Sequence, residues 1–382
     1  MGSCFSMLVR TYQRCSGVIA DRRAILAARL SAMQRLHTML INSSKSATSN
    51  EVIAAVIRLT LNDIFFMEDT DDLRLHVEGA LEMARARGGL AVLASTGENL
   101  AKIMIVVDLV TAVILEAPAL LSADEISEFT RLVNNNKNNN TTATATAPAH
   151  QISPFEIAVP PSLDPATAAM LKDMDFLLNT FLTQPLDDSS TWQTCKLQTT
   201  LDWVEDRISA TPDDPSPFSL GTSASAYTEE PAALLLHRAV RFSSLLYCHA
   251  IRARRPFSWA AAAAASAPEG AGRGDGVTVQ AVAEAVRRMP PEMWWDSDSH
   301  FGGGPGGKML QTLVSVLAVV LPSSTSALSS SSVAGDHGYN AARAICVAAA
   351  VELALVDWGV AVKVLGRVIE LQAWLRRFSQ QG

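Results

Sequence analysis

The sequence predicts an all-α fold, a multi-helix array of antiparallel helices with low-complexity loop insertions. Apolar residues recur every three or four positions through most of the chain, which is the period of an amphipathic helix. Runs with the strict alternation of a half-buried strand are essentially missing. A helix stop signal followed directly by a second helical pattern, within residues 71–118, is a third indication.

That stop signal defines a corner between two helices. Residues 72–87 are expected to form the first helix, because their apolar positions share one face: Leu73, Val77, Ala80, Leu81 and Ala84. Gly88 then takes the left-handed conformation that ends a helix, and Leu90 folds back in a Schellman motif. Ser95 followed by Glu98 is typical of a capping box, so the second helix is expected to begin there.

The rest of the chain reads as further helices separated by polar or low-complexity segments. Residues 1–16 are expected to be an N-terminal segment, and residues 17–382 a single all-helical domain of regulatory type. Low-complexity sequence predicts flexible insertions at 134–160, 260–276 and 322–338. Further helices are expected at residues 21–40, after a cap at Asn50, and at 163–181, 191–208, 229–254, 277–288, 309–321, 340–358 and 360–378.

A set of spaced residues in and around the corner carries a resemblance to a known family: His76, Gly79, Met83, Arg87, Gly88, Gly89, Asp108 and Pro118. With them the chain resembles the fungal-specific transcription factor domain, best over residues 17–121 and more weakly over 234–256. In that family the helical region usually lies C-terminal to a zinc binuclear cluster that binds DNA. The resemblance implies a region that governs activation and acts with a related transcription regulator or as a homodimer.

The zinc cluster itself is absent from this sequence. The 5 cysteines are scattered, and no His or Cys spacing predicts a metal site, so neither a metal nor another cofactor is expected. A formal net charge of −7 opposes direct binding to nucleic-acid phosphates. The two most apolar stretches, 101–121 and 341–362, contain charged residues, so no transmembrane segment is expected. The expected location is the nucleus or the cytoplasm.

Asp108 is the most unusual polar residue, since apolar residues surround it in the sequence. A carboxylate so placed requires a partner, and Arg87 across the helix corner is the expected one, with Arg58 as an alternative. A catalytic Asp108 is the competing interpretation. Because no base or nucleophile accompanies it, the chain is not expected to be an enzyme.

Two short motifs offer other chemistry. The N-terminal sequence fits N-myristoylation, with Gly2 as the acceptor and Cys4 available for palmitoylation. Residues 302–308 have the literal spacing of a phosphate-binding loop, but Met309 replaces the hydroxyl residue that would hold magnesium, so a flexible linker is expected.

The sequence therefore predicts a transcription-regulator-like helical domain that acts through protein or ligand contacts, without its own DNA-binding module. The alternative is a helical enzyme or a lipid-anchored protein that binds a small molecule between its helices.

Overall fold

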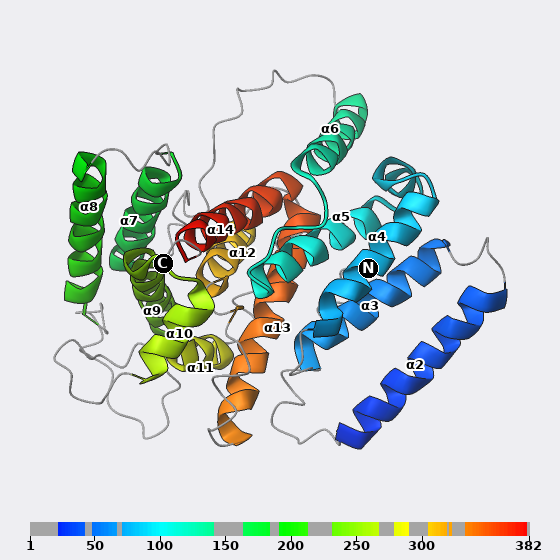
Figure 1. Ribbon diagram of the computed structural model, residues 1–382, viewed down its shortest axis with the longest axis horizontal. Helices are drawn as coiled ribbons and strands as arrows, with labels where there is room; N and C mark the ends of the chain where they lie inside the picture. The colour runs from blue at the N-terminus through cyan, green and yellow to red at the C-terminus, as the bar shows by residue number, and fades with distance from the viewer. Residues whose placement is uncertain are drawn as a thin grey trace.

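The computed structural model describes residues 22–42, 48–66, 71–140, 163–183, 191–212, 231–266, 279–289, 305–318, 321–322 and 333–379. These residues form helices and contain no strand, which confirms the all-α prediction (Figure 1). The helices are α2 (Arg22–Asn42), α3 (Asn50–Phe66), α4 (Asp71–Ala86), α5 (Leu90–Ile114), α6 (Ala123–Asn140), α7 (Pro165–Leu182), α8 (Thr191–Ala210), α9 (Ala232–Ala253), α10 (Phe257–Ser266), α11 (Val279–Arg288), α12 (Pro305–Leu317), α13 (Val333–Val356) and α14 (Trp358–Ser379).

Two helices form the centre of the array. In α5 every residue from Leu100 to Ile114 is buried, and in α13 every residue from Ala342 to Val351 is buried. A helix that is apolar on all sides has to be surrounded by other helices. Accordingly, α13 packs against α3, α5, α11, α12 and α14.

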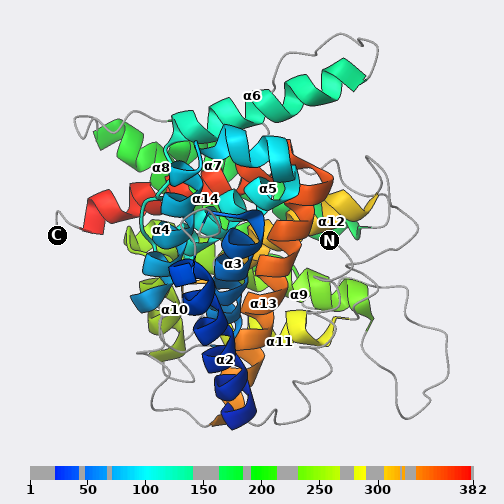
Figure 2. The ribbon, with the colours of Figure 1, turned by 90° about the vertical axis from the view of Figure 1, so that its right-hand side faces the viewer.

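The remaining helices cover this centre from two sides (Figures 1 and 2). On one side α3 and α4 pack against α5, and α2 packs against α3. On the other side α9 carries α7, α8, α10 and α11, while α6 lies across one end of the array in both views. No helix among the described residues combines the length and the apolar character that crossing a membrane requires.

The corner between α4 and α5 is confirmed in detail. The Gly89 amide donates to the Ala84 carbonyl (2.8 Å) and the Gly88 amide to the Arg85 carbonyl (2.9 Å), which is the bond pair of a Schellman motif. Both glycines have positive φ, +112° at Gly88 and +85° at Gly89. A side chain at either position would be strained, so these glycines let the two helices meet.

The predicted capping box at Ser95 and Glu98 is wrong, because α5 already begins at Leu90. The Ser95 hydroxyl donates to the Val92 carbonyl within the first turns of α5. The helix is interrupted further on, at Gly97, where φ is −170° and ψ is 68°.

Asn50 is not the cap of α3 either. The Ser49 hydroxyl accepts the hydrogen bond from the Val52 amide (3.4 Å), so Ser49 caps this helix.

The three predicted insertions are shorter than expected. Helix α6 continues through the asparagine tract to Asn140, α10 includes the alanine run up to Ser266, and α13 begins at Val333. Alanine has the highest helix propensity, which explains α10 directly. The remainders, 141–160, 267–276 and 323–332, lie outside the described residues.

The flexible linker predicted at residues 302–308 does not extend over the whole motif. Helix α12 begins at Pro305, so residues 305–308 are helical.

Candidate functional site

The predicted contact between Arg87 and Asp108 does not form. The Arg87 guanidinium instead donates to the Asn50 side-chain oxygen (2.5 Å), to the Thr96 hydroxyl (3.0 Å) and to the Thr48 carbonyl (3.2 Å). These partners lie at the start of α3 and before the break in α5. Arg87 is therefore a structural residue, as expected, but it fastens the corner to α3 rather than to the middle of α5.

Asp108 is 1% exposed and holds the turn after α5. Its two carboxylate oxygens accept hydrogen bonds from the backbone amides of Leu120 (3.0 Å) and Leu121 (2.9 Å). Burial raises the pKa of Asp108, while these two hydrogen bonds and the positive charges of Arg74 and Arg85 oppose the rise. Arg58, the alternative partner, is exposed on α3.

The other motif residues also stabilise the array. His76 pairs through Nδ1 with the buried Asp63 carboxylate of α3 (2.7 Å). Met83 packs partly buried against the core, and the Pro118 carbonyl accepts from Arg74 (3.4 Å). Gly79 faces open space, where an added Cβ would meet no atom within 4 Å. Within the described part of the chain, these residues thus connect helices of the array.

Other predicted sites are either structural or outside the described residues. Gly2 and Cys4 lie outside them. Over the described part of the chain, no group of three or more His, Cys, Asp or Glu is placed to hold a metal ion. His237 is fully buried, and its two ring nitrogens contact the Thr167 hydroxyl (2.7 Å) and the Pro212 carbonyl (3.0 Å), so it connects α9 to α7 and to the end of α8.

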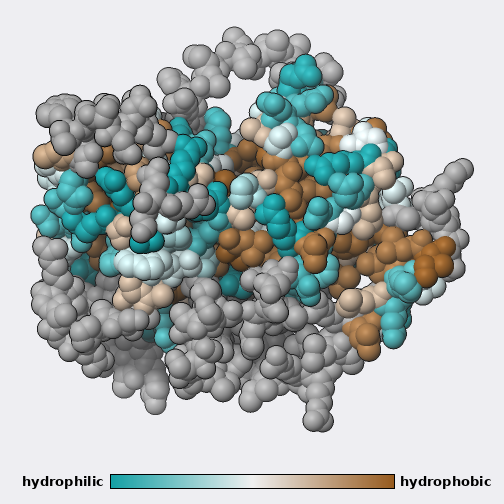
Figure 3. Space-filling model, viewed as in Figure 1, coloured by the Kyte–Doolittle hydropathy of each residue, from teal (hydrophilic) through white to brown (hydrophobic). Residues whose placement is uncertain are grey.

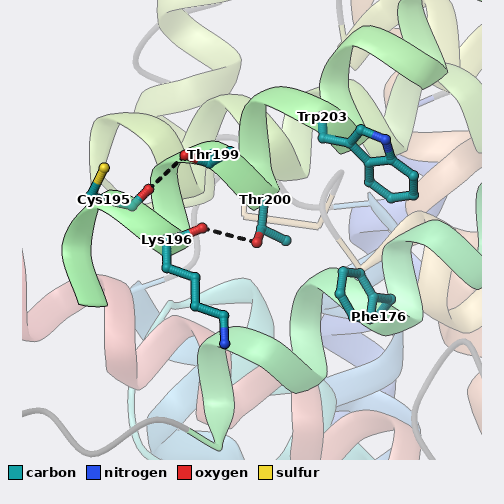
Figure 4. A pocket seen from close by; sticks show the side chains of 6 residues that line it. All are labelled: Phe176, Cys195, Lys196, Thr199, Thr200 and Trp203. Carbon is teal, nitrogen blue, oxygen red and sulfur yellow. Dashed lines mark hydrogen bonds between the residues drawn. The ribbon is translucent and has the colours of Figure 1, made fainter. Parts of the chain in front are cut away.

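The structure does form a surface hollow of about 560 Å³, between α7 and α8 (Figure 4). Its size lies within the range of small-molecule sites. Among the described helices, α7 and α9 are those that pack extensively on α8. The hollow is lined by Phe176, Cys195, Lys196, Thr199, Thr200 and Trp203.

Two half-exposed aromatic rings dominate this hollow. Phe176 is 53% exposed and Trp203 is 46% exposed, and their ring centroids lie 6.4 Å apart with the planes at 82°. This edge-to-face arrangement is favourable for aromatic rings and fixes both in place. Single exposed apolar residues are common, but a paired tryptophan and phenylalanine on neighbouring helices form a continuous apolar surface.

An ion pair supports the tryptophan from the side. The guanidinium of Arg207 lies 4.7 Å from the centroid of the Trp203 ring and is held by the Asp173 carboxylate of α7 (3.1 Å). Burial raises the pKa of Asp173, and the charge of Arg207 opposes this rise. Trp203 therefore has a supported orientation rather than a free one.

The hydroxyl groups in the hollow are already engaged with main-chain atoms. The Thr199 hydroxyl donates to the Cys195 carbonyl and the Thr200 hydroxyl to the Lys196 carbonyl, each at a distance of 2.9 Å (Figure 4). The surface that remains consists of ring faces, methyl groups, the side chain of Lys196 and the exposed thiol of Cys195. The ring faces and methyl groups suit apolar groups.

A second exposed apolar group lies on α2, at the right of Figure 3. It consists of Leu30, Met33, Met39, Leu40 and Ile41, which are between 36% and 68% exposed.

Comparisons of this chain with protein-family models, with curated proteins and with solved structures find no match. The resemblance to the fungal-specific transcription factor domain therefore stays a prediction from the sequence.

The period of apolar residues predicts α7 and α8, but it does not predict this hollow. In α8 the buried residues Leu201, Val204 and Ile208 define the inward face at helical spacing. Trp203 lies outside that face, and a tryptophan on the outer side of a helix is the sequence feature that indicates an exposed apolar surface.

Proposed function

We propose that this chain is a non-enzymatic, all-helical regulatory or interaction domain that acts through protein contacts in the nucleus or the cytoplasm. Its role would be similar to that of the fungal transcription factor region, without a DNA-binding module of its own. The observation that carries the proposal is the apolar surface formed by Phe176 and Trp203, since rigid aromatic side chains with polar surroundings are typical anchors of protein interfaces.

The polar groups of the described residues support a binding role over a catalytic one. Asp108 and His237 are the most deeply buried candidates for acid–base chemistry, and each is used to connect helices. Arg252, at the end of α9, is paired with Asp202 and Glu205 of α8. These carboxylates compensate the charge of Arg252 and so weaken its attraction for phosphates.

Fusion of the chain to a heterologous DNA-binding module tests the proposal. We expect the fusion to change reporter transcription relative to the module alone, and Trp203→Ala to abolish the change while the helical content is retained. Trp259→Ala is a matched control, because Trp259 is 43% exposed but lies on α10, away from the hollow. An unchanged reporter, or equal loss in both variants, would contradict the proposal.

The dimensions of the hollow favour a second candidate function, the binding of a small apolar molecule. A volume of about 560 Å³ suits a ligand of that class. Titration with an environment-sensitive apolar dye distinguishes the two, since a ligand site predicts saturable binding that is lost in Trp203→Ala and kept in Trp259→Ala.

A further inference from the structure

Arginines from two distant parts of the chain meet where α9 and α14 end. Arg254 and Arg255 follow directly after α9, and Arg376 and Arg377 lie in the last turn of α14. The Arg254 guanidinium lies 4.7 Å from the centroid of the Phe378 ring, and this contact joins the two pairs. The end of α14 projects from the array at the left of Figure 2. The fold thus assembles these four arginines, here called the arginine patch, from parts of the chain that are far apart in sequence.

The described carboxylates leave the arginine patch positively charged. Elsewhere on the array exposed arginines form ion pairs with carboxylates: Arg85 with Glu82, Arg207 with Asp173, and Arg287 with Glu284. Among the described residues, by contrast, no carboxylate forms an ion pair with Arg254, Arg255 or Arg377. Arg376 donates to the main-chain carbonyl of Glu116, whose carboxylate accepts from the first amides of α10. In a chain of net charge −7 this local excess of positive charge attracts an anionic partner.

The backbone at Arg254 is a second indication of a binding role. Its φ is +51° and its ψ is 44°, which is the left-handed conformation that disfavours a side chain. The turn has the same Schellman bond pair as the corner after α4, with the amides of Arg254 and Arg255 as donors (both 3.1 Å). After α4 the corresponding position is Gly88. An arginine is therefore kept where glycine would be less strained, and such strained positions are concentrated at binding sites.

The side chains of the patch suit carboxylates. A guanidinium stacked on a ring keeps its N–H groups at its edges, where it can donate two parallel hydrogen bonds to one carboxylate. The Phe378 ring holds Arg254 in this way, while the Glu116 carbonyl holds Arg376. Arg377 is exposed and Arg255 is half-buried. Because part of the patch is already held in place, binding costs less conformational entropy.

We propose that the arginine patch is a docking site for an acidic segment of a partner protein, whose carboxylates pair with Arg254, Arg255 and Arg377. Nucleic acid fits less well, because tight binding needs phosphate contacts along an extended surface and the net charge of −7 opposes them. A membrane surface also fits less well, since Arg254 covers the ring of Phe378 that would have to insert into it. The arginine patch shares no residue with the hollow between α7 and α8, so it adds a second interface to the proposed function.

Fluorescence anisotropy with the full chain tests this docking site. The probe is a labelled synthetic peptide of glutamates with interspersed leucines, and a peptide with lysines in place of the glutamates is its control. We expect saturable binding of the glutamate peptide alone, and Arg254→Glu and Arg377→Glu should each raise its dissociation constant by about tenfold. Raising the salt concentration from about 50 mM to about 200 mM should also weaken binding, because salt screens exposed charges. Arg131→Glu is the matched control, since it reverses the charge of an exposed arginine on α6 and should leave the dissociation constant unchanged.

Arg254→Gly separates binding from a structural role. Glycine relieves the left-handed strain but removes the guanidinium. The melting temperature should therefore stay unchanged or rise, while the glutamate peptide should bind about threefold or more weakly. A lower melting temperature with unchanged peptide affinity would assign Arg254 to the fold and overturn the docking site. If Arg254→Gly changes the helical content measured by circular dichroism, Arg377→Glu still decides, because it alters only an exposed side chain.

Two further results would also overturn the proposed docking. The first is a glutamate peptide that does not bind, or that is weakened equally by Arg131→Glu. The second is tighter binding of a labelled single-stranded oligonucleotide, or of vesicles containing phosphatidylserine, which would assign the patch to nucleic acid or to a membrane. Neither result affects the reporter assay of Trp203→Ala, because Trp203 lies outside the arginine patch.

Discussion

Replacing Asp108 tests how the turn after α5 is held. In Asp108→Ala the backbone amides of Leu120 and Leu121 lose their acceptors, which lie 3.0 Å and 2.9 Å away. A buried donor left without a partner costs about 1–3 kcal/mol. Because Leu121 is 4% exposed and Leu120 is only partly buried, we expect a loss of about 2–4 kcal/mol in the free energy of unfolding.

Urea denaturation followed by circular dichroism measures this loss, and Asp108→Asn provides the graded control. The asparagine side chain has one acceptor oxygen, so it should retain about half of the stabilisation. A double-mutant cycle with Arg87→Ala should give a coupling energy below about 0.5 kcal/mol, because Arg87 bonds to Asn50, Thr48 and Thr96 instead. A loss below about 0.5 kcal/mol in Asp108→Ala, or strong coupling to Arg87, would refute this reasoning.

The same carboxylate gives a pH dependence of known sign. Burial raises the pKa of Asp108 in the folded protein above its ordinary value of 3.8, so the folded state binds the proton more tightly than the unfolded state. This contribution to stability is complete below pH 3.8 and is lost as the pH rises through the folded-state pKa. The free energy of unfolding of wild type, taken relative to that of Asp108→Asn, should therefore fall as the pH rises from 3.8, and a rise would contradict the assignment.

Four further substitutions test other parts of the fold by thermal unfolding. Gly89→Ala should lower the free energy of unfolding by about 1–3 kcal/mol, because φ is +85° at this position. Gly88→Ala adds a contact of 2.9 Å between the new Cβ and the side chain of Val92, so the second substitution Val92→Ala should restore part of the stability that Gly88→Ala removes. Glu116→Ala removes the carboxylate that accepts from the first amides of α10, and should cost about 1–3 kcal/mol and speed hydrogen exchange in α10 first. Tyr247→Phe leaves a buried main-chain carbonyl without the hydroxyl 2.8 Å away and should cost about 1–2 kcal/mol, so an unchanged melting temperature would argue against that bond.

The corner between α4 and α5 was predictable because its determinants are local. A helix stop depends on the conformation of Gly88 and Gly89 and on hydrogen bonds within five residues, all of which are readable from sequence. The same holds for the period of apolar residues, which located most of the helices.

The partners of the buried polar residues were not predictable in the same way. Asp108 bonds to amides twelve and thirteen residues later, while Arg87 reaches Asn50 at a separation of 37 residues. Both sets of hydrogen bonds depend on how α3, α5 and the turn after α5 pack against each other, and this packing cannot be read from a single sequence.

Composition alone does not predict the extent of α6 and α10. The asparagine tract is typical of a flexible loop, yet α6 also contains Ile126, Phe129 and Val133, which are buried at helical spacing. Phe129 packs edge-to-face with Trp358 of α14 at 5.1 Å, and this long-range contact stabilises the helix that the asparagines merely extend.

The position of Trp203 connects the fold to the proposed function. Residues 100–114 of α5 and residues 342–351 of α13 are buried, so these segments offer no surface to another molecule. In α8 the inward face of Leu201, Val204 and Ile208 already supplies the apolar surface that packs it against α7 and α9. A second apolar face is unnecessary for that packing, and a half-exposed tryptophan leaves apolar area in water that a bound molecule would cover. Because Arg207 and Asp173 also hold the Trp203 ring in place, its exposure is explained by contacts beyond the fold, as the proposed function requires.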